Sequence, residues 1–333
     1  MAERTYDFRP FEASYGEWEA QFASGGKPGE FSYRIGGPTS LYGTTDTVIS
    51  RATIGLLPVG ANERAAWAAV INGFQDPRTG WYRKRYTLHF RSHTAAYAVA
   101  ALALLGHRPA RPVDEALRVA SSREATVSWL ERIPWSIVWP SSHIVAGLPA
   151  ILHMTGQGSN EFWETYFAWL DAHVHPQTGF WSRGLLHRIG VRPPLAMAEL
   201  GGAFHMHFVY EARGRRWPLP ERVVDAALAL QNANGLWDGE VPYCIDLDGL
   251  YSMIRSSRYA GGYREADVLR SVHRYLAQAE RTLCDRDFLF ARYLDSHRLT
   301  GALSAVAECA KWYPGLVVTG RAWRQTLDEA CFI

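Results

Sequence analysis

The stretch LQNANGLWDG, Leu230–Gly239, places an apolar helical run before a polar turn, a glycine and a tryptophan. Two earlier stretches repeat this order, GFQDPRTGWY at Gly73–Tyr82 and AHVHPQTGFW at Ala172–Trp181. Glycine lets the chain reverse after a helix, because it has no Cβ to oppose a positive φ. The large aromatic side chain after it fills the wedge between neighbouring helical hairpins. Three copies of one turn therefore predict a wall built from repeated hairpins.

A second segment recurs beside these turns, an apolar helix rich in Ala, Gly and Ser that begins near a polar residue. Examples are SHTAAYAVAALALLG from Ser92 and SSHIVAGLPAILHMTG from Ser141. Six such segments are marked, in chain order, by Asp46, His93, His143, His205, Asp248 and His297. The markers follow one another at a loose period of about fifty residues, which is typical of a repeat architecture.

More amphipathic helices are expected between these segments, such as NEFWETYFAWLDAHV from Asn160 and ERVVDAALALQ from Glu221. Their apolar residues recur three and four positions apart, which is the period of one helix face. Polar residues such as Ser92 mark helix starts, and glycines such as Gly106 and Gly156 mark helix ends. No alternating apolar pattern of useful length predicts a strand.

The predicted fold is all-α, an (α/α)6 toroid, or barrel, of about six helical hairpins with an inner and an outer ring. An open solenoid is the alternative, but the inner helices are apolar nearly all round, and an open array would expose that surface on its concave side. We expect one domain over residues 1–333. It comprises an N-terminal extension at 1–41, the repeats at 42–311 and a C-terminal tail at 312–333.

Composition limits the class of protein. Of the 333 residues, 47% are hydrophobic, which is enough for a large core. The formal net charge of +2 predicts neither nucleic acid nor a membrane as partner. The start, MAERTYDFRP, lacks the apolar core of a signal peptide, and the longest apolar run, Ala95–Leu105, is too short to cross a bilayer. We expect a cytoplasmic protein, because no CxxC pair occurs among the cysteines, Cys244, Cys284, Cys309 and Cys331.

The LQNANGLW and DPRTGWY turns resemble the Q…GxW repeats of the α/α-toroid superfamily, which includes terpenoid cyclases and protein prenyltransferases. Related six-hairpin barrels occur in polysaccharide lyases, unsaturated glucuronyl hydrolases and sugar epimerases. The resemblance covers Tyr42 to Lys311 and implies the architecture. It does not imply one chemistry, because such barrels carry out many reactions.

Two members of that superfamily offer motifs for comparison. Class II terpenoid cyclases carry a DxDD acid motif after a GxW turn, and here Asp246-Leu-Asp248-Gly249 follows Trp237. The resemblance implies that Asp248 matches the proton-donating Asp, whereas Gly249 replaces the final Asp and counts against protonation of an alkene. Prenyltransferases bind zinc through Asp, Cys and His, but Cys244 precedes Asp246 at a different spacing. No zinc site is therefore carried over.

If the inner helices start at the same end of the barrel, their first residues converge on its mouth. Free N–H groups and positive dipole ends there favour an anion such as a carboxylate. Five of the twelve histidines fall in these starts. The catalytic candidates are His93, His205, Asp248, Asp246 and Tyr243. The substrate-binding candidates are His143, His297, Arg298, Asp46, Trp139 and Tyr210.

Each candidate also has a structural interpretation. Asp46 and Asp246 are equally suited to capping a helix, and the aromatic candidates are equally suited to the core. His205 and His207 lie two residues apart on a helix and face different ways, and we expect His205 to face the cavity. His93, His143, His205 and Asp248 have the donor types of a metal site. No HExxH-like spacing supports one, so we expect neither metal nor cofactor, and proton transfer by neutral His with a carboxylate partner.

The first functional hypothesis is a carbohydrate-active lyase or hydrolase on a small or acidic saccharide. A lyase removes the proton alpha to a uronate carboxylate, offsets the charge on that carboxylate and protonates the leaving oxygen. The candidates are His93 or His205 as base, Arg298 or His143 beside the carboxylate, and Tyr243 or His297 as acid. In a hydrolase, Asp246 or Asp248 acts as acid or base.

Two further hypotheses remain, a terpenoid cyclase-like enzyme with Asp248 as acid and a non-catalytic binding toroid. The expected partner is a small molecule or an oligosaccharide, with no nucleic acid and no membrane. The substrate and the oligomeric state are left open by the sequence.

Overall fold

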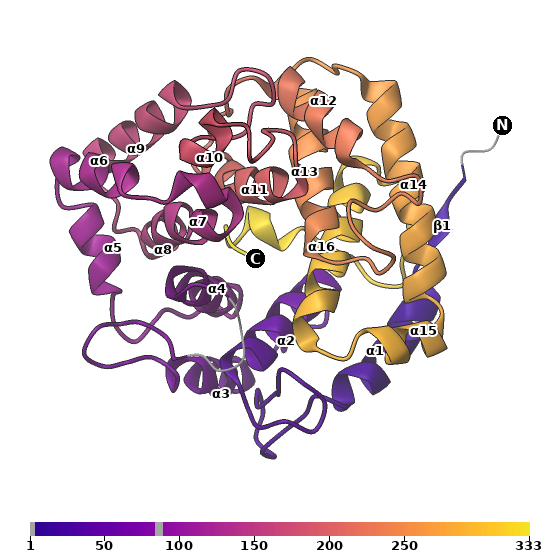
Figure 1. Ribbon diagram of the computed structural model, residues 1–333. Coiled ribbons are helices and arrows are strands. Elements are labelled where there is room, and N and C mark those ends of the chain that lie inside the picture. The colour runs from indigo at the N-terminus through magenta and orange to yellow at the C-terminus, as the bar shows by residue number, and fades with distance from the viewer. Residues whose placement is uncertain (1–3, 84–88) are drawn as a thin grey trace.

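The computed structural model describes residues 4–83 and 89–333, and its long elements are helices (Figure 1). Over these residues the one named strand pair is β1 (Tyr6–Asp7) with β2 (Val317–Val318), which run parallel. This pair ties the start of the chain to the segment that follows the last long helix. The prediction of an all-α protein is confirmed.

Long buried helices surround the centre of the molecule. They are α2 (Leu41–Thr53), α4 (Arg91–Leu104), α7 (Val138–Val145) with α8 (Gly147–Thr155), α11 (Met197–Ala212), α13 (Cys244–Tyr259) and α16 (Ser296–Trp312). Each contacts the next in this order, and α16 packs back against α2 (Figure 1). The first and last members of the series are thus neighbours, and side chains far apart in sequence meet at the centre.

A second set of helices lies outside this ring. They are α1 (Arg9–Ala20), α3 (Ala61–Asn72), α5 (Asp114–Val119), α6 (Arg123–Glu131), α9 (Asn160–Ala172), α10 (Leu185–Arg188), α12 (Pro220–Leu230), α14 (Glu265–Leu283) and α15 (Arg286–Arg292). Helix α14 shows why the longer ones stay at the periphery. It buries Val268, Val272, Tyr275 and Ala279 at spacings of three and four, while its other face is exposed.

The repeated GxW turns have the geometry that their glycines predict. Gly80, Gly179 and Gly235 have φ of +75°, +71° and +91°, a region that disfavours side chains. A Cβ on Gly235 would also lie 2.5 Å from the carbonyl oxygen of Arg274, at the neighbouring outer helix. Both the backbone conformation and the close approach therefore require glycine.

Gln and Trp side chains fasten the turns to neighbouring helices, and the third turn has both. Gln231 Nε2 donates to the carbonyl oxygens of Gly235 and Ser271, 2.9 and 3.2 Å away. Gln75 makes the equivalent pair of hydrogen bonds in the first turn. Trp237 Nε1 donates 2.9 Å to Ala227 in the preceding outer helix, and Trp181 does the same to Leu170. The repeated sequence is thus a repeated joint between hairpins.

One helical stretch, Trp135–Thr155, is long and apolar enough to cross a membrane by length and composition. It is longer than the Ala95–Leu105 run that stands out in the sequence. Its most apolar window is 67% buried inside the protein, and the helix breaks at Ala146 between α7 and α8. This burial is that of a core helix.

The chain ends lie against the repeats. In the N-terminal extension, Trp18 Nε1 donates 2.9 Å to the carbonyl oxygen of Tyr293. In the C-terminal tail, residues Ala330–Ile333 are buried, and the chain reaches the centre of the ring (Figure 1). The tail therefore forms part of the surroundings of the centre.

Candidate active site at the centre of the helical ring

A cavity of about 330 Å³ lies among the inner helices. Its lining comprises His89, His93, Tyr97, Trp139, Pro140, His143, Phe204, His205, Cys244, Asp248, His297, Thr300, Gly301 and Ile333. Five imidazoles, one carboxyl group and one thiol thus face the same space. A volume of this order suits a small ligand and is too small for a polymer chain.

A larger pocket of about 680 Å³ lies between the start of α2 and helix α3, away from the central cavity. Its described lining includes Glu30 and Arg83 but no His, Cys or Asp. The central cavity is the better candidate, because chemistry needs several titratable groups that converge on one point.

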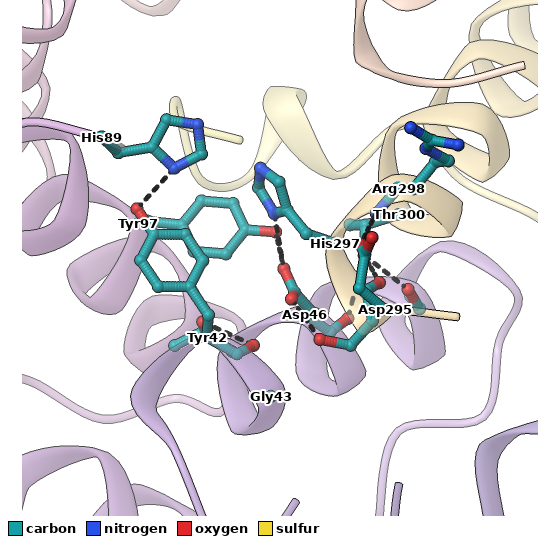
Figure 2. A network of polar contacts seen from close by, with 12 residues as sticks. Tyr42, Gly43, Asp46, His89, Tyr97, Asp295, His297, Arg298 and Thr300 are labelled. Carbon is teal, nitrogen blue, oxygen red and sulfur yellow. Dashed lines mark hydrogen bonds and ion pairs between the residues drawn. The ribbon is translucent and has the colours of Figure 1, made fainter. Parts of the chain in front are cut away.

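Asp46 and His297 form a hydrogen-bonded pair beside the cavity (Figure 2). His297 Nδ1 lies 2.9 Å from Asp46 Oδ1. The same carboxylate accepts hydrogen bonds from Tyr97 Oη at 2.7 Å and from Ser296 Oγ at 2.5 Å. Asp46 is fully buried and does not line the cavity itself. It therefore fixes the orientation of the His297 ring.

The Asp46 carboxylate also sets the proton affinity of His297. Burial lowers the pKa of His297, but the charge and the hydrogen bond of Asp46 outweigh this, and the pKa is raised above its ordinary value. With Nδ1 directed at Asp46, Nε2 is the ring nitrogen that can exchange a proton with a molecule in the cavity. This is the arrangement of a base held by a carboxylate.

His205 is held in a similar way, but by neutral groups. Ser142 Oγ donates its proton to the carbonyl oxygen of Trp139 at 2.5 Å, so it accepts from His205 Nδ1, 2.7 Å away. This tautomer leaves a lone pair on Nε2. Burial lowers the pKa of His205 to about 3, so the ring is neutral near pH 7.

His89 and His93 stack face to face, with ring centroids 4.1 Å apart and an interplanar angle of 12°. Nδ1 of each ring lies 3.0 Å from Tyr42 Oη. His143 packs edge-on against His93, with centroids 4.7 Å apart. Burial and the neighbouring imidazoles lower the pKa of His93 well below its ordinary value. These rings form a nitrogen-rich wall.

Asp248 lies on α13 and faces the cavity. Its Oδ2 is buried and has no hydrogen-bond partner within residues 4–83 and 89–333. Burial, and the charge of Asp246, raise the pKa of Asp248 well above its ordinary value. The raised pKa favours the protonated form of Asp248, which can donate a proton.

The structure places three predicted catalytic residues, His93, His205 and Asp248, around the cavity, and two outside it. Asp246 is a helix cap, because its two oxygens accept from the backbone N–H groups of Trp237 and Tyr243 at 2.8 and 2.9 Å. Tyr243 turns its hydroxyl outward and donates to Asp238 at 2.5 Å. Neither lines the cavity.

Among the predicted binding residues, His143, His297 and Trp139 line the cavity, and Asp46 lies behind His297. Arg298 is exposed and points away from Asp46 and His297 (Figure 2), with its guanidinium 5.9 Å from the ring of Tyr243. It cannot offset a substrate charge in the cavity.

Tyr210 is a core residue rather than a binding residue. Its hydroxyl donates to Asp171 at 2.5 Å, and its ring packs against Phe167. His207 likewise turns away from the cavity, with Nδ1 2.9 Å from Ser252 Oγ and its ring stacked on Trp217. His205 therefore faces the cavity and His207 the wall, as expected from their spacing.

The sequence reasoning missed several residues of the site. His89 had a usable signal, because it precedes His93 by four residues in HFRSH, and Tyr97 follows His93 by one helical turn. Ile333 and Phe332 had none. Ile333 lines the cavity, and the Phe332 ring lies 4.9 Å from His93, because a tail distant in sequence returns to the centre.

No protein-family model matches the chain, and no curated protein or solved structure matches it significantly. The function is therefore argued from the geometry alone.

Proposed function

We propose that the chain is an acid–base enzyme, a lyase that acts on a small acidic saccharide. The observation that carries the proposal is the buried Asp46–His297 pair, which directs a basic nitrogen towards a cavity that also holds the neutral acid Asp248. A base and an acid with pKa values set by different surroundings are the two groups that an elimination needs.

In the proposed reaction, His297 Nε2 takes the proton alpha to the substrate carboxylate. The electron pair of that C–H bond forms the new C=C bond, and the neighbouring C–O bond breaks. Asp248 gives its proton to the leaving oxygen. The imidazoles of His143 and His93 line the cavity where the carboxylate would lie, whereas Arg298 lies outside it.

A hydrolase mechanism has weaker support. Glycosidases use two carboxyl groups on either side of the scissile bond. The oxygens of Asp46 and Asp246 are engaged by hydrogen bonds, so Asp248 is left as a single cavity carboxyl. One carboxyl with several imidazoles favours elimination over hydrolysis.

The other parts of the proposal follow from shape and composition. The closed order of helix contacts favours an α/α toroid with inner and outer rings. The small cavity favours a short saccharide over a polymer, with no nucleic acid and no membrane as partner. Four free cysteines favour a cytoplasmic location.

The test is incubation of the protein with uronate-containing disaccharides and oligosaccharides, with the ultraviolet absorbance of the unsaturated product as readout. His297→Ala and Asp248→Asn should each lower kcat by about 10²–10⁴-fold, the range for loss of one acid–base group. His107→Ala, beyond the far end of α4, is the matched control and should leave kcat unchanged. Absence of product from every uronate, or full activity of His297→Ala, contradicts the proposal.

A terpenoid cyclase-like enzyme is the second candidate, because Asp248 is a neutral acid beside the aromatic rings of Trp139 and Phe204. Two observations count against it. A side chain on Gly249 would overlap the Trp237 ring, which explains why the third Asp of the cyclase motif is missing. The imidazoles would also take a proton from a carbocation. Cyclisation of a prenyl substrate by the wild-type chain, lost in Asp248→Asn, would favour this candidate over the lyase.

A further inference from the structure

Three histidines of the cavity wall meet at one point. His89, His93 and His143 each offer a ring nitrogen, and these nitrogens lie within 4.8 Å of one another. His93 and His143 are buried, and His89 is half-buried. They come from the segment before α4, from the first turn of α4 and from the end of α7, so the fold gathers them from two places.

We propose that His89, His93 and His143 bind one divalent transition-metal ion, Zn²⁺ above others. A tetrahedral site with Zn–N bonds of 2.0–2.1 Å sets its nitrogens roughly 3.4 Å apart. Small side-chain rotations, each moving a nitrogen by about an ångström or less, close the difference from the observed spacing.

The hydrogen bonds to Tyr42 orient two of the rings and give one of them the tautomer of a metal ligand, while the other ring must change its tautomer to bind through Nε2. Metal-binding histidines usually anchor the second ring nitrogen on another group, which fixes the tautomer and the ring orientation. Tyr42 Oη lies 3.0 Å from Nδ1 of both His89 and His93. Its single proton can go to one ring only, so the other ring donates to the phenol oxygen and has its lone pair on Nε2.

The chemical type of the three ligands determines which metal ions suit the site. The three ligands are imidazoles, which suit Zn²⁺, Co²⁺, Ni²⁺ and Cu²⁺, whereas Mg²⁺ and Ca²⁺ prefer oxygen ligands. Three protein ligands leave the fourth position of a tetrahedral ion to water or substrate, as in catalytic zinc sites. That position adjoins the cavity, which all three rings line.

The test is a titration of metal-stripped wild-type protein with Zn²⁺ alone by calorimetry, and with Co²⁺ alone by visible absorption. We expect one equivalent of Zn²⁺ and the absorption bands of tetrahedral Co²⁺. His143→Ala and His89→Ala should weaken Zn²⁺ binding at least 100-fold, and Tyr42→Phe about 10–100-fold. His107→Ala should bind like wild type.

Failure of the wild-type chain to bind stoichiometric Zn²⁺ overturns the proposal, and so does equal binding by wild type and His143→Ala. His89→Ala guards against a folding defect, because this residue is half-buried and precedes the helix. The titration needs no saccharide, so it is independent of the proposed reaction. Zinc binding without lyase activity refutes only the reaction, and activity without zinc binding refutes only the metal site.

Discussion

Helix α13 buries Asp248 in its first half and Arg255 in its second half, and these two side chains have opposite surroundings. Asp248 and Arg255 are each 1% exposed. Arg255 Nε lies 2.7 Å from Glu308, Nη1 2.9 Å from Glu211 and Nη2 3.0 Å from Asp328. Asp248 faces the cavity, and its Oδ2 has no hydrogen-bond partner in the described part of the chain.

The difference separates a structural charge from a functional one. Burial lowers the pKa of Arg255, but the carboxylates led by Glu308 outweigh it and the pKa is raised, so the guanidinium stays charged. The Arg255 guanidinium links α11, α13, α16 and the C-terminal tail through ion pairs. Asp248 Oδ2 has no such partner within residues 4–83 and 89–333, and its raised pKa favours the protonated form. A buried polar group without a partner destabilises the fold, and in the proposed reaction a substrate in the cavity would supply that partner.

The largest effect is expected from breaking the network of Arg255. Arg255→Met leaves Glu308 buried without its partner, and loss of one member of a buried ion pair costs about 3–5 kcal/mol of unfolding free energy. Urea denaturation measures this loss. The double variant Arg255→Met with Glu308→Gln should recover part of the stability. A single variant as stable as wild type would show that Arg255 is not a structural tie.

Asp248→Asn should leave the stability nearly unchanged and lower the activity. The amide has nearly the shape of the neutral carboxyl, so the unfolding free energy should change by less than about 1 kcal/mol. The kcat on a uronate substrate should fall by about 10²–10⁴-fold. Denaturation and kinetics on the same preparation give both numbers. A large loss of stability with normal kcat would assign Asp248 to the structure instead.

His207 is a further buried ionisable group. Its imidazole has a hydrogen-bond partner, Ser252, and it lies outside the cavity. Burial lowers its pKa to about 3, against about 6.5 in the unfolded chain. Between these pH values the unfolded chain binds a proton that the folded chain does not, so stability is lost as pH falls below about 6.5. From pH 6.5 to 5 the loss is about 2 kcal/mol for this residue.

The measurement compares wild type with His207→Asn by urea denaturation at several pH values. The difference in unfolding free energy between the two should shift by about 2 kcal/mol from pH 6.5 to 5, and should be constant above pH 7. A difference that does not vary with pH would mean that His207 titrates normally in the folded protein.

The smallest effect is expected at the surface. Arg264 pairs with Asp225 at 2.9 Å, but the two side chains are 39% and 32% exposed. Solvent screens such a pair, so Asp225→Asn should cost less than about 1 kcal/mol. A cost comparable to that of Arg255→Met would show that burial does not explain the difference between the networks.

The sequence predicted the parts of this molecule that depend on local pattern. Gly80, Gly179 and Gly235 identified the turns, because each needs a positive φ within its own segment. The spacing of His205 and His207 predicted which one faces the centre. The polar residues near the starts of α4, α13 and α16 predicted that His93, Asp248 and His297 lie together, and all three line the cavity.

The remaining features depend on distant partners that no local pattern encodes. Asp246 could be assigned to capping only once the backbone of Trp237 was seen to return to it. The partners of Arg255 come from positions 211, 308 and 328. His205 was expected at a helix start, but it is the ninth residue of α11, because that helix begins at Met197.

The most direct test of the account is the protonation state of Asp248. Infrared difference spectra between wild type and Asp248→Asn at neutral pH isolate the signal of this one side chain. The account predicts the carbonyl band of a protonated carboxylic acid. A carboxylate band in its place would mean that Asp248 is charged like Arg255, and the proposed acid would be lost.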